Sequence, residues 1–229
     1  MEQNLFSVER LATVVTGAAS GIGLAYAQAM AENGARVTLM DIDGQGAERA
    51  AQTLRDSGAD ARAATVDVTN REQLFAAVDA AAEHYGALDA VFANAGIDAG
   101  PGFLTAEGER NPDGMLESID PSHWRAVVDT NLGGVFTTLQ AAVPHMKKAG
   151  GGRIVVTTSN AAVINEPIVG TPYMPAKAGA ASLVRQAALE LAQHNIRVNA
   201  IAPGPFATNI AGGRLRNPAD RRVVSRDVV

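Results

Sequence analysis

Tyr173 and Lys177 stand four residues apart in a segment with a helical pattern. Side chains at this spacing lie on one face of a helix, one turn apart. An ammonium group beside a phenol favours the phenolate and lowers a pKa that is ordinarily near 10. The pair could therefore take a proton from an alcohol or give one to a ketone. The alternative is a buried tyrosine beside a lysine whose head reaches solvent.

A glycine-rich turn separates an apolar run at 11–15 from an alanine-rich helical pattern at 24–32. Glycine lets the backbone approach a ligand closely, and the amides and dipole of a helix start attract a pyrophosphate. Asp41 ends the next predicted strand, where an acid accepts hydrogen bonds from a ribose and repels a 2′-phosphate. These features predict a dinucleotide site that prefers NAD to NADP. The predicted contacts are Gly17, Ser20, Gly21, Ile22, Gly23 and Asp41.

Length and composition restrict the classes of protein and partner. The chain has 229 residues, which suits one α/β domain with a sizeable core. Its net charge is −5 and it carries no basic stripe, so a nucleic-acid partner is not expected. The absence of cysteine excludes disulfides and thiolate chemistry. The polar, acidic N-terminus and the lack of a long apolar run predict a cytoplasmic protein without a membrane segment.

Apolar, often β-branched runs alternate with longer helical patterns along the chain. This alternation predicts an α/β fold, a Rossmann-type doubly wound parallel sheet with helices on both faces and a single domain over 1–229. The predicted strands are 11–16, 36–41, 61–66, 90–93, 153–158 and 197–201. The predicted helices are 22–33, 46–56, 71–85, 122–148 and 173–194, with Asn70 and Ser122 near helix starts as capping residues.

Three elements together resemble the short-chain dehydrogenase/reductase (SDR) family: the T-G-x-x-x-G-x-G turn, the triplet at 94–96 and the pair Tyr173 and Lys177. The resemblance runs from Leu11 to Thr208, most of the chain. It implies an NAD(P)-dependent oxidoreductase that interconverts an alcohol and a carbonyl compound. In that reaction Tyr173 is the acid/base, and Lys177 lowers its pKa and holds the nicotinamide ribose.

Ser159 and Asn131 complete the catalytic set that the resemblance implies. Ser159 follows a predicted strand at its carboxyl end, where a hydroxyl can stabilise charge on a substrate oxygen. The most common family spacing to the tyrosine would select Asn160, but alignment of the preceding strand favours Ser159. Asn131 resembles the family residue that holds a water linking the lysine to solvent. Alternatively, Ser159 is a turn or cap residue and Asn131 a solvated helix residue.

Further cofactor contacts are expected at the carboxyl ends of the strands. The resemblance assigns them to Asp67, Val68, Asn94, Ala95, Gly96, Pro203, Gly204 and Thr208. These residues have alternative roles: Asp67 could cap a helix, Asn94 could brace the sheet, and residues 203–208 could be ordinary turn residues.

Two segments depart from the family pattern. The stretch 97–120 is long and rich in glycine, proline and acids, and it is either a lid that shapes the substrate pocket or a surface loop. The arginine-containing tail 209–229 does not resemble the family's closing segment, so we expect the sheet to lack its usual seventh strand. Such a chain could instead be a truncated, non-catalytic NAD-binding relative. An epimerase or dehydratase on the same scaffold is a third possibility.

The remaining expectations concern metals and partners. The four histidines are far apart in the sequence and none shows a metal-binding spacing, so no metal site is expected. The expected small-molecule partner is an alcohol or carbonyl substrate. The family pairs the helices equivalent to 122–148 and 173–194 across a symmetric interface, so a homodimer is expected, and a homotetramer is the alternative.

Overall fold

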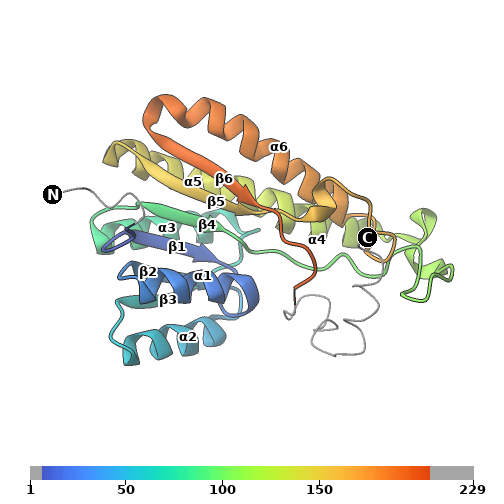
Figure 1. Cartoon of the computed structure of the whole chain (residues 1–229), viewed down its shortest axis with the longest axis horizontal. Coiled ribbons are helices and arrows are strands. Elements are labelled where there is room, and N and C mark those ends of the chain that lie inside the picture. Colours follow the sequence, from blue (N-terminus) through green and yellow to red (C-terminus); the bar gives the residue numbers. More distant parts are fainter. Residues whose placement is uncertain (1–6, 207–229) are drawn as a thin grey trace.

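The computed structural model describes residues 7–206 and contains one six-stranded parallel sheet in the order β3-β2-β1-β4-β5-β6. Figure 1 shows the sheet through the middle of the molecule. The strands are β1 (Ala12–Thr16), β2 (Arg36–Asp41), β3 (Ala61–Thr65), β4 (Ala90–Ala93), β5 (Gly152–Thr157) and β6 (Ile196–Ile201). The doubly wound fold is confirmed, and residues 7–206 contain no seventh strand.

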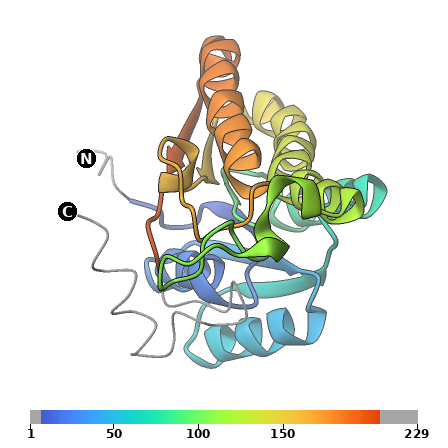
Figure 2. The same cartoon turned by 90° about the vertical axis from the view of Figure 1, so that its right-hand side faces the viewer.

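Helices lie on both faces of the sheet (Figure 2). One face packs against α1 and α2, and the other against α3, α5 and α6. The helices are α1 (Gly21–Glu32), α2 (Gly44–Asp56), α3 (Arg71–Tyr85), α4 (Pro121–Val128), α5 (Gly134–Ala149) and α6 (Tyr173–Leu191). Because helices cover both faces of the sheet, both faces of β1 are buried, which explains why the sequence of this central strand is an apolar run.

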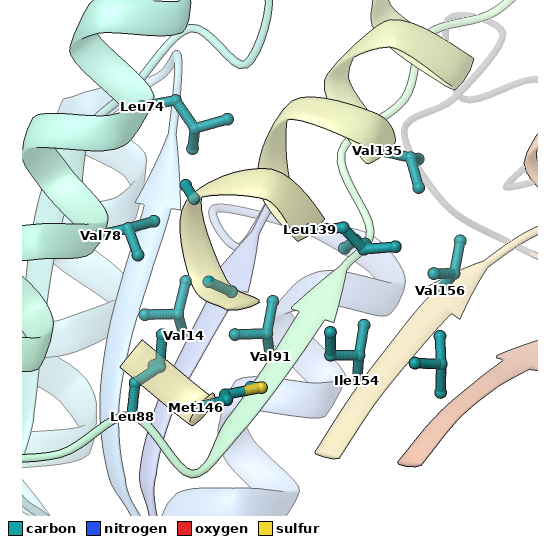
Figure 3. Close-up of a cluster of buried hydrophobic side chains, with 14 of the residues drawn as sticks. Val14, Leu74, Val78, Leu88, Val91, Val135, Leu139, Met146, Ile154 and Val156 are labelled. Atoms are coloured by element: carbon teal, nitrogen blue, oxygen red, sulfur yellow. The ribbon is translucent and has the colours of Figure 1, made fainter. Parts of the chain in front are cut away.

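The larger hydrophobic core lies between the sheet and the α3, α5 and α6 face. Figure 3 shows Val14, Val91 and Ile154 projecting from neighbouring strands toward the helices. Leu139 and Met146 of α5 pack against them, and Met146 is fully buried. The strand residues are β-branched and the two helix residues are not, which suits the two backbones, so propensity and packing agree.

The long helix predicted at 122–148 is interrupted. A π-helical segment, Asp129–Gly133, separates α4 from α5. Within it the amide nitrogen of Asn131 donates to the carbonyl oxygen of Val127 at 3.1 Å, a polar contact that competes with regular helix bonding. The prediction that Ser122 caps this helix is also wrong, because Asp120 accepts from the backbone of Ser122, whereas the Asn70 cap of α3 is confirmed.

The segment 97–120 is ordered against the loop before α6. Backbone bonds join Gly102 to Ile168 (3.2 Å), Leu104 to Pro167 (3.0 Å) and Gly170 to Gly100 (3.1 Å). A Cβ atom at Gly102 would lie 2.1 Å from a carbonyl oxygen of this neighbouring loop, so glycine permits the close approach. Two short 3₁₀ turns follow, Pro112–Gly114 and Leu116–Ser118. The 97–120 segment and the loop before α6 thus pack together beyond the carboxyl ends of the strands (Figure 1).

Candidate active site

A cleft of about 690 Å³ opens at the carboxyl ends of the strands. It brings together most of the predicted residues: the glycine-rich turn, the ends of β2, β4 and β5, the start of α6 and the 203–204 pair. Gly23 and Asn131 do not line it, and Thr208 lies outside the described residues. The other predicted residues thus lie around one continuous cleft.

The glycine-rich turn forms a cradle at the start of α1. Gly17 and Gly21 have φ angles of +67° and +57°, which other residues adopt only with strain. Gly23 lies behind the turn, where a Cβ atom would be 2.0 Å from the carbonyl oxygen of Gly17. Ser20, the N-cap, makes no side-chain cap bond, and the first turn of α1 contains no acid. The helix amides are therefore available to an anion, which fits a pyrophosphate.

Asp41 lies at the end of β2 and lines the cleft. One carboxylate oxygen accepts from the backbone N–H of Ala19 at 2.9 Å, and the other accepts from Asp43 at 2.9 Å. The carboxylate is held in a fixed orientation and ties β2 to the glycine-rich turn. Lys177 is the only basic side chain among the described residues that line the cleft, so none of them pairs with a phosphate beside Asp41.

Asp67 and Val68 lie where β3 leads into α3, and both line the cleft. Asp67 accepts from the backbone N–H and the hydroxyl of Thr69, at 2.8 and 2.7 Å. Asn70 is the N-cap of α3, so Asp67 does not have that role. Val68 is buried against the position of Gly134, where a Cβ atom would lie 2.7 Å from its Cγ2.

Asn94 braces the centre of the sheet. Its amide nitrogen donates to the carbonyl oxygens of Thr16 (3.1 Å) and Gly17 (3.2 Å), and its amide oxygen accepts from the Thr157 hydroxyl at 3.0 Å. These bonds join the ends of β1, β4 and β5. The contacts support the structural reading of Asn94, while Ala95 and Gly96 continue the wall of the cleft.

Tyr173 and Lys177 begin α6 on the same face, as the spacing predicts. Lys177 is 3% exposed, and its Nζ donates to the carbonyl oxygen of Thr157 at 2.9 Å. Burial lowers the pKa of Lys177 to about 8. The Nζ atom lies 5.6 Å from the centre of the Tyr173 ring.

The pKa of Tyr173 is raised in the chain by itself, whereas the predicted lowering relies on Lys177 together with the positive charge of an oxidised nicotinamide. Burial of the phenol is the main cause, and the negative charge of Asp98 acts in the same direction. A hydrogen bond with the Ser159 side chain opposes both. The sequence indicated the lysine but not the depth at which the phenol is buried.

Ser159 and Asn160 follow β5 and form a hydrogen-bonded group with Glu166. The Ser159 hydroxyl donates to the amide oxygen of Asn160 at 3.1 Å and accepts from the backbone N–H of Ala161 at 3.1 Å. The amide nitrogen of Asn160 donates to Oε1 of Glu166 at 3.0 Å. Ser159 was predicted from the sequence, whereas Asn160 and Glu166, which also line the cleft, were not predicted as site residues. The family spacing that selected Asn160 was the one available signal.

Asn131 is fully buried behind the cleft wall. Its amide nitrogen donates to the Ile97 carbonyl oxygen at 3.0 Å, and its amide oxygen accepts from the Ile97 N–H at 3.2 Å. A Cβ atom at Gly96 would lie 2.5 Å from this oxygen and 3.5 Å from Nζ of Lys177. Asn131 therefore lies on the lysine side of the site and anchors the start of the 97–120 segment.

Within residues 7–206, no group of three or more histidine, aspartate or glutamate side chains could hold a metal ion. Across the same residues, no helix is both long and apolar enough to cross a membrane.

Comparison with known proteins gives consistent similarities. A model of the short chain dehydrogenase family matches residues 12–218. The cis-4-hydroxycyclohexanecarboxylate dehydrogenase of Sinomonas cyclohexanicum is 41% identical over 214 residues, 93% of this chain and 79% of that protein. The cyclohexanol dehydrogenase of Acinetobacter sp. strain SE19 is 37% identical, over 85% and 72% of the two chains. The structure of an NAD⁺-bound xylitol dehydrogenase is 34% identical with a TM-score of 0.77, over 86% and 71% of the two chains.

Proposed function

Because the chain belongs to the short-chain dehydrogenase family, we propose that it is an NAD(H)-dependent oxidoreductase that interconverts a secondary alcohol and a ketone. The observation that carries the proposal is the convergence of Tyr173, Ser159 and Lys177 on the cleft that also holds the glycine-rich turn. Relatives named as cyclohexanol and xylitol dehydrogenases support an alcohol as the substrate class.

In the proposed reaction Tyr173 exchanges a proton with the substrate oxygen, and the Ser159 hydroxyl stabilises charge on the same oxygen. The nicotinamide, when bound, supplies the hydride acceptor or donor. The positive charge of Lys177 favours the phenolate of Tyr173, and its ammonium group is the proposed contact of the nicotinamide ribose. Asn131 is the proposed holder of the relay water, although its described hydrogen bonds are all to backbone.

The glycine-rich turn and Asp41 are the proposed determinants of the cofactor. The available amides of α1 would hold the pyrophosphate, and the fixed carboxylate of Asp41 would accept from ribose hydroxyls. A 2′-phosphate at this place would meet a negative charge, which favours NAD. The remaining proposed contacts are Asp67, Val68, Ala95, Gly96, Pro203 and Gly204, all of which line the cleft.

The 97–120 segment is proposed to be a lid over the substrate end of a single dinucleotide-binding domain. Ala106 and Glu107 at its tip line the same cleft as Tyr173. Its backbone bonds to the loop before α6 fix the base of the segment. A surface loop without a role would not contribute to the cleft wall.

Cofactor titration and turnover test the proposal together. We expect saturable binding of NADH, detected by its fluorescence, with NADPH bound at least tenfold more weakly. With a panel of secondary alcohols, NADH should accumulate, which an epimerase or dehydratase that regenerates NAD would not produce. Y173F should lower kcat by about 10²- to 10⁴-fold while NADH affinity stays within twofold.

Two outcomes would overturn the assignment. An unchanged rate in Y173F would remove Tyr173 from the chemistry. NADH binding without turnover of any alcohol or ketone would instead favour a non-catalytic nucleotide-binding protein.

A further inference from the structure

The charged side chains that line the cleft are nearly all acidic. Asp98, Glu107 and Glu166 lie at its substrate end, while Asp41 and Asp67 lie at the proposed cofactor end. Among the described residues, the only basic side chain of the lining is Lys177, whose Nζ is buried against the Thr157 carbonyl oxygen. The substrate therefore enters a region of negative potential.

This potential reaches the reacting group. The charge of Asp98 contributes to the raised pKa of Tyr173. All five carboxylates line the cleft, so their negative charge acts on the molecule that occupies it.

Glu166 has a defined orientation at the substrate end. The amide of Asn160 lies between the backbone N–H of Ala161, which can only donate, and the Glu166 carboxylate, which when ionised can only accept. The amide oxygen must face Ala161 and Ser159, and the amide nitrogen must face Glu166. The orientation of Glu166 is therefore linked through Asn160 to the hydroxyl of Ser159.

One oxygen of Glu166 retains its hydrogen-bonding capacity. Oε1 accepts from Asn160, and the described residues supply no hydrogen bond to Oε2. The side chain is half-buried in the cleft wall, and its backbone N–H lies 3.4 Å from the sulfur of Met174, the residue after Tyr173. A carboxylate oxygen in the wall of the cleft that Tyr173 and Ser159 also line is suited to accept a hydrogen bond from a substrate hydroxyl.

We propose that Glu166 determines substrate specificity: it accepts a hydrogen bond from a second hydroxyl of an uncharged alcohol, and with its acidic neighbours it disfavours substrates that carry a carboxylate or phosphate. The inference rests on the proposed alcohol oxidation. It adds the substrate class, a neutral diol or polyol and the corresponding hydroxyketone.

Three ring alcohols test this inference: cyclohexanol, cyclohexane-1,4-diol and 4-hydroxycyclohexanecarboxylate. The last two differ only in the group at one ring position. For the native chain we expect kcat/KM for the diol to exceed that for the carboxylate at least tenfold. In E166Q this ratio should fall about tenfold. If E166Q lowers activity by disturbing Asn160 and Ser159, kcat/KM falls for both the diol and the carboxylate, and this effect cancels in their ratio.

E109Q is the matched control, because it removes an exposed carboxylate of the 97–120 segment that does not line the cleft. Its diol-to-carboxylate ratio should equal that of the native chain. Equal turnover of the diol and the carboxylate by the native chain, or equal shifts in E166Q and E109Q, would overturn the inference. Turnover of cyclohexanol without such discrimination separates this failure from failure of the proposed function, in which none of the three alcohols is oxidised.

Discussion

Lys177 shows how the site places a charge where solvation is poor. Its ammonium group is almost fully buried and has the Thr157 carbonyl oxygen as its hydrogen-bond acceptor, so the charged form is penalised. The phenol of Tyr173 is buried as well, and its neutral form is favoured. The chain alone thus opposes charge on both residues. In the proposed function, a bound positively charged nicotinamide would shift the phenol toward phenolate.

The burial of Lys177 predicts a pH-dependent stability. Its pKa is about 8 in the folded chain and 10.5 ordinarily, so between these values the unfolded chain binds more protons. The free energy of unfolding should therefore rise with pH from 8 to 10, by about 2 kcal/mol. Above pH 10 the raised pKa of Tyr173 acts in the opposite direction. Urea unfolding at successive pH values measures this rise, which K177M should abolish.

The exposed Lys148 provides the control, since K148M should keep the native pH dependence. A rise of equal size in K177M would show that another group is responsible. K177M should also lose alcohol oxidation whatever its stability, because the positive charge of Lys177 is part of the proposed chemistry.

The sequence predicted the residues of the site better than their environment. Tyr173 and Lys177 were selected by their types and spacing, and Ser159 by its place after a predicted strand and by the family resemblance. Asn160 and Glu166 were missed because the loop that brings them together has no periodic pattern. The direction of the Tyr173 pKa shift depends on burial by the surrounding loops, which a spacing in the sequence does not encode.

At the scale of elements, hydrophobic periodicity predicted the strands to within one residue at each end. It did not predict the break between α4 and α5. Periodicity reports which face of a helix is buried, and that face continues from Val127 through Val135. The π-helical segment depends instead on one buried amide, Asn131, whose partners at Ile97 are distant in the sequence.

Adjacent glycines in this region provide a matched test of packing. A Cβ atom at Gly134 would lie 2.7 Å from Cγ2 of the buried Val68, whereas at Gly133 the nearest atom is 3.9 Å away. G134A should lower the free energy of unfolding by about 1–3 kcal/mol through overpacking. G133A should be neutral or stabilise by up to about 1 kcal/mol, the helix-propensity gain. Urea unfolding compares the two variants.

NADH affinity adds a second readout to this comparison. Val68 lines the cleft, so its displacement in G134A should weaken NADH binding, while G133A should bind as the native chain does. If G134A matches G133A in both stability and affinity, the contact with Val68 does not constrain this junction.

At the scale of the whole molecule, the two faces of the sheet are covered unequally within residues 7–206. α3, α5 and α6 cover one face along its length, and Ile196 and Val198 of β6 are buried there. The alternate residues Arg197, Asn199 and Ile201 are exposed, and Ile201 is 45% exposed. In this region β6 pairs with β5 alone. The alternation from Ile196 to Asn199 thus matches a strand with helix cover on one side, whereas at the end of β6 Ala200 is exposed as well.

The proposed homodimer would bury apolar side chains that α5 and α6 leave in solvent. Phe136 of α5 is 49% exposed and Leu189 of α6 is 77% exposed, on the two helices that the family pairs across its symmetric interface. Light scattering after size exclusion should give about twice the monomer mass of 23.6 kDa. L189D should shift the mass toward the monomer, because an aspartate in an apolar interface is desolvated without a partner.

Val163 provides the control for this prediction, because it is 85% exposed but lies in the loop after β5 and belongs to neither helix. V163D adds the same charge and should keep the native mass. A native chain of monomer mass, or L189D and V163D of equal mass, would rule out Leu189 as part of a dimer interface. The cleft lies at the carboxyl ends of the strands. Because α5 and α6 lie on one face of the sheet (Figure 2), a dimer through these helices should leave the cleft accessible. L189D should therefore change the mass far more than the kcat.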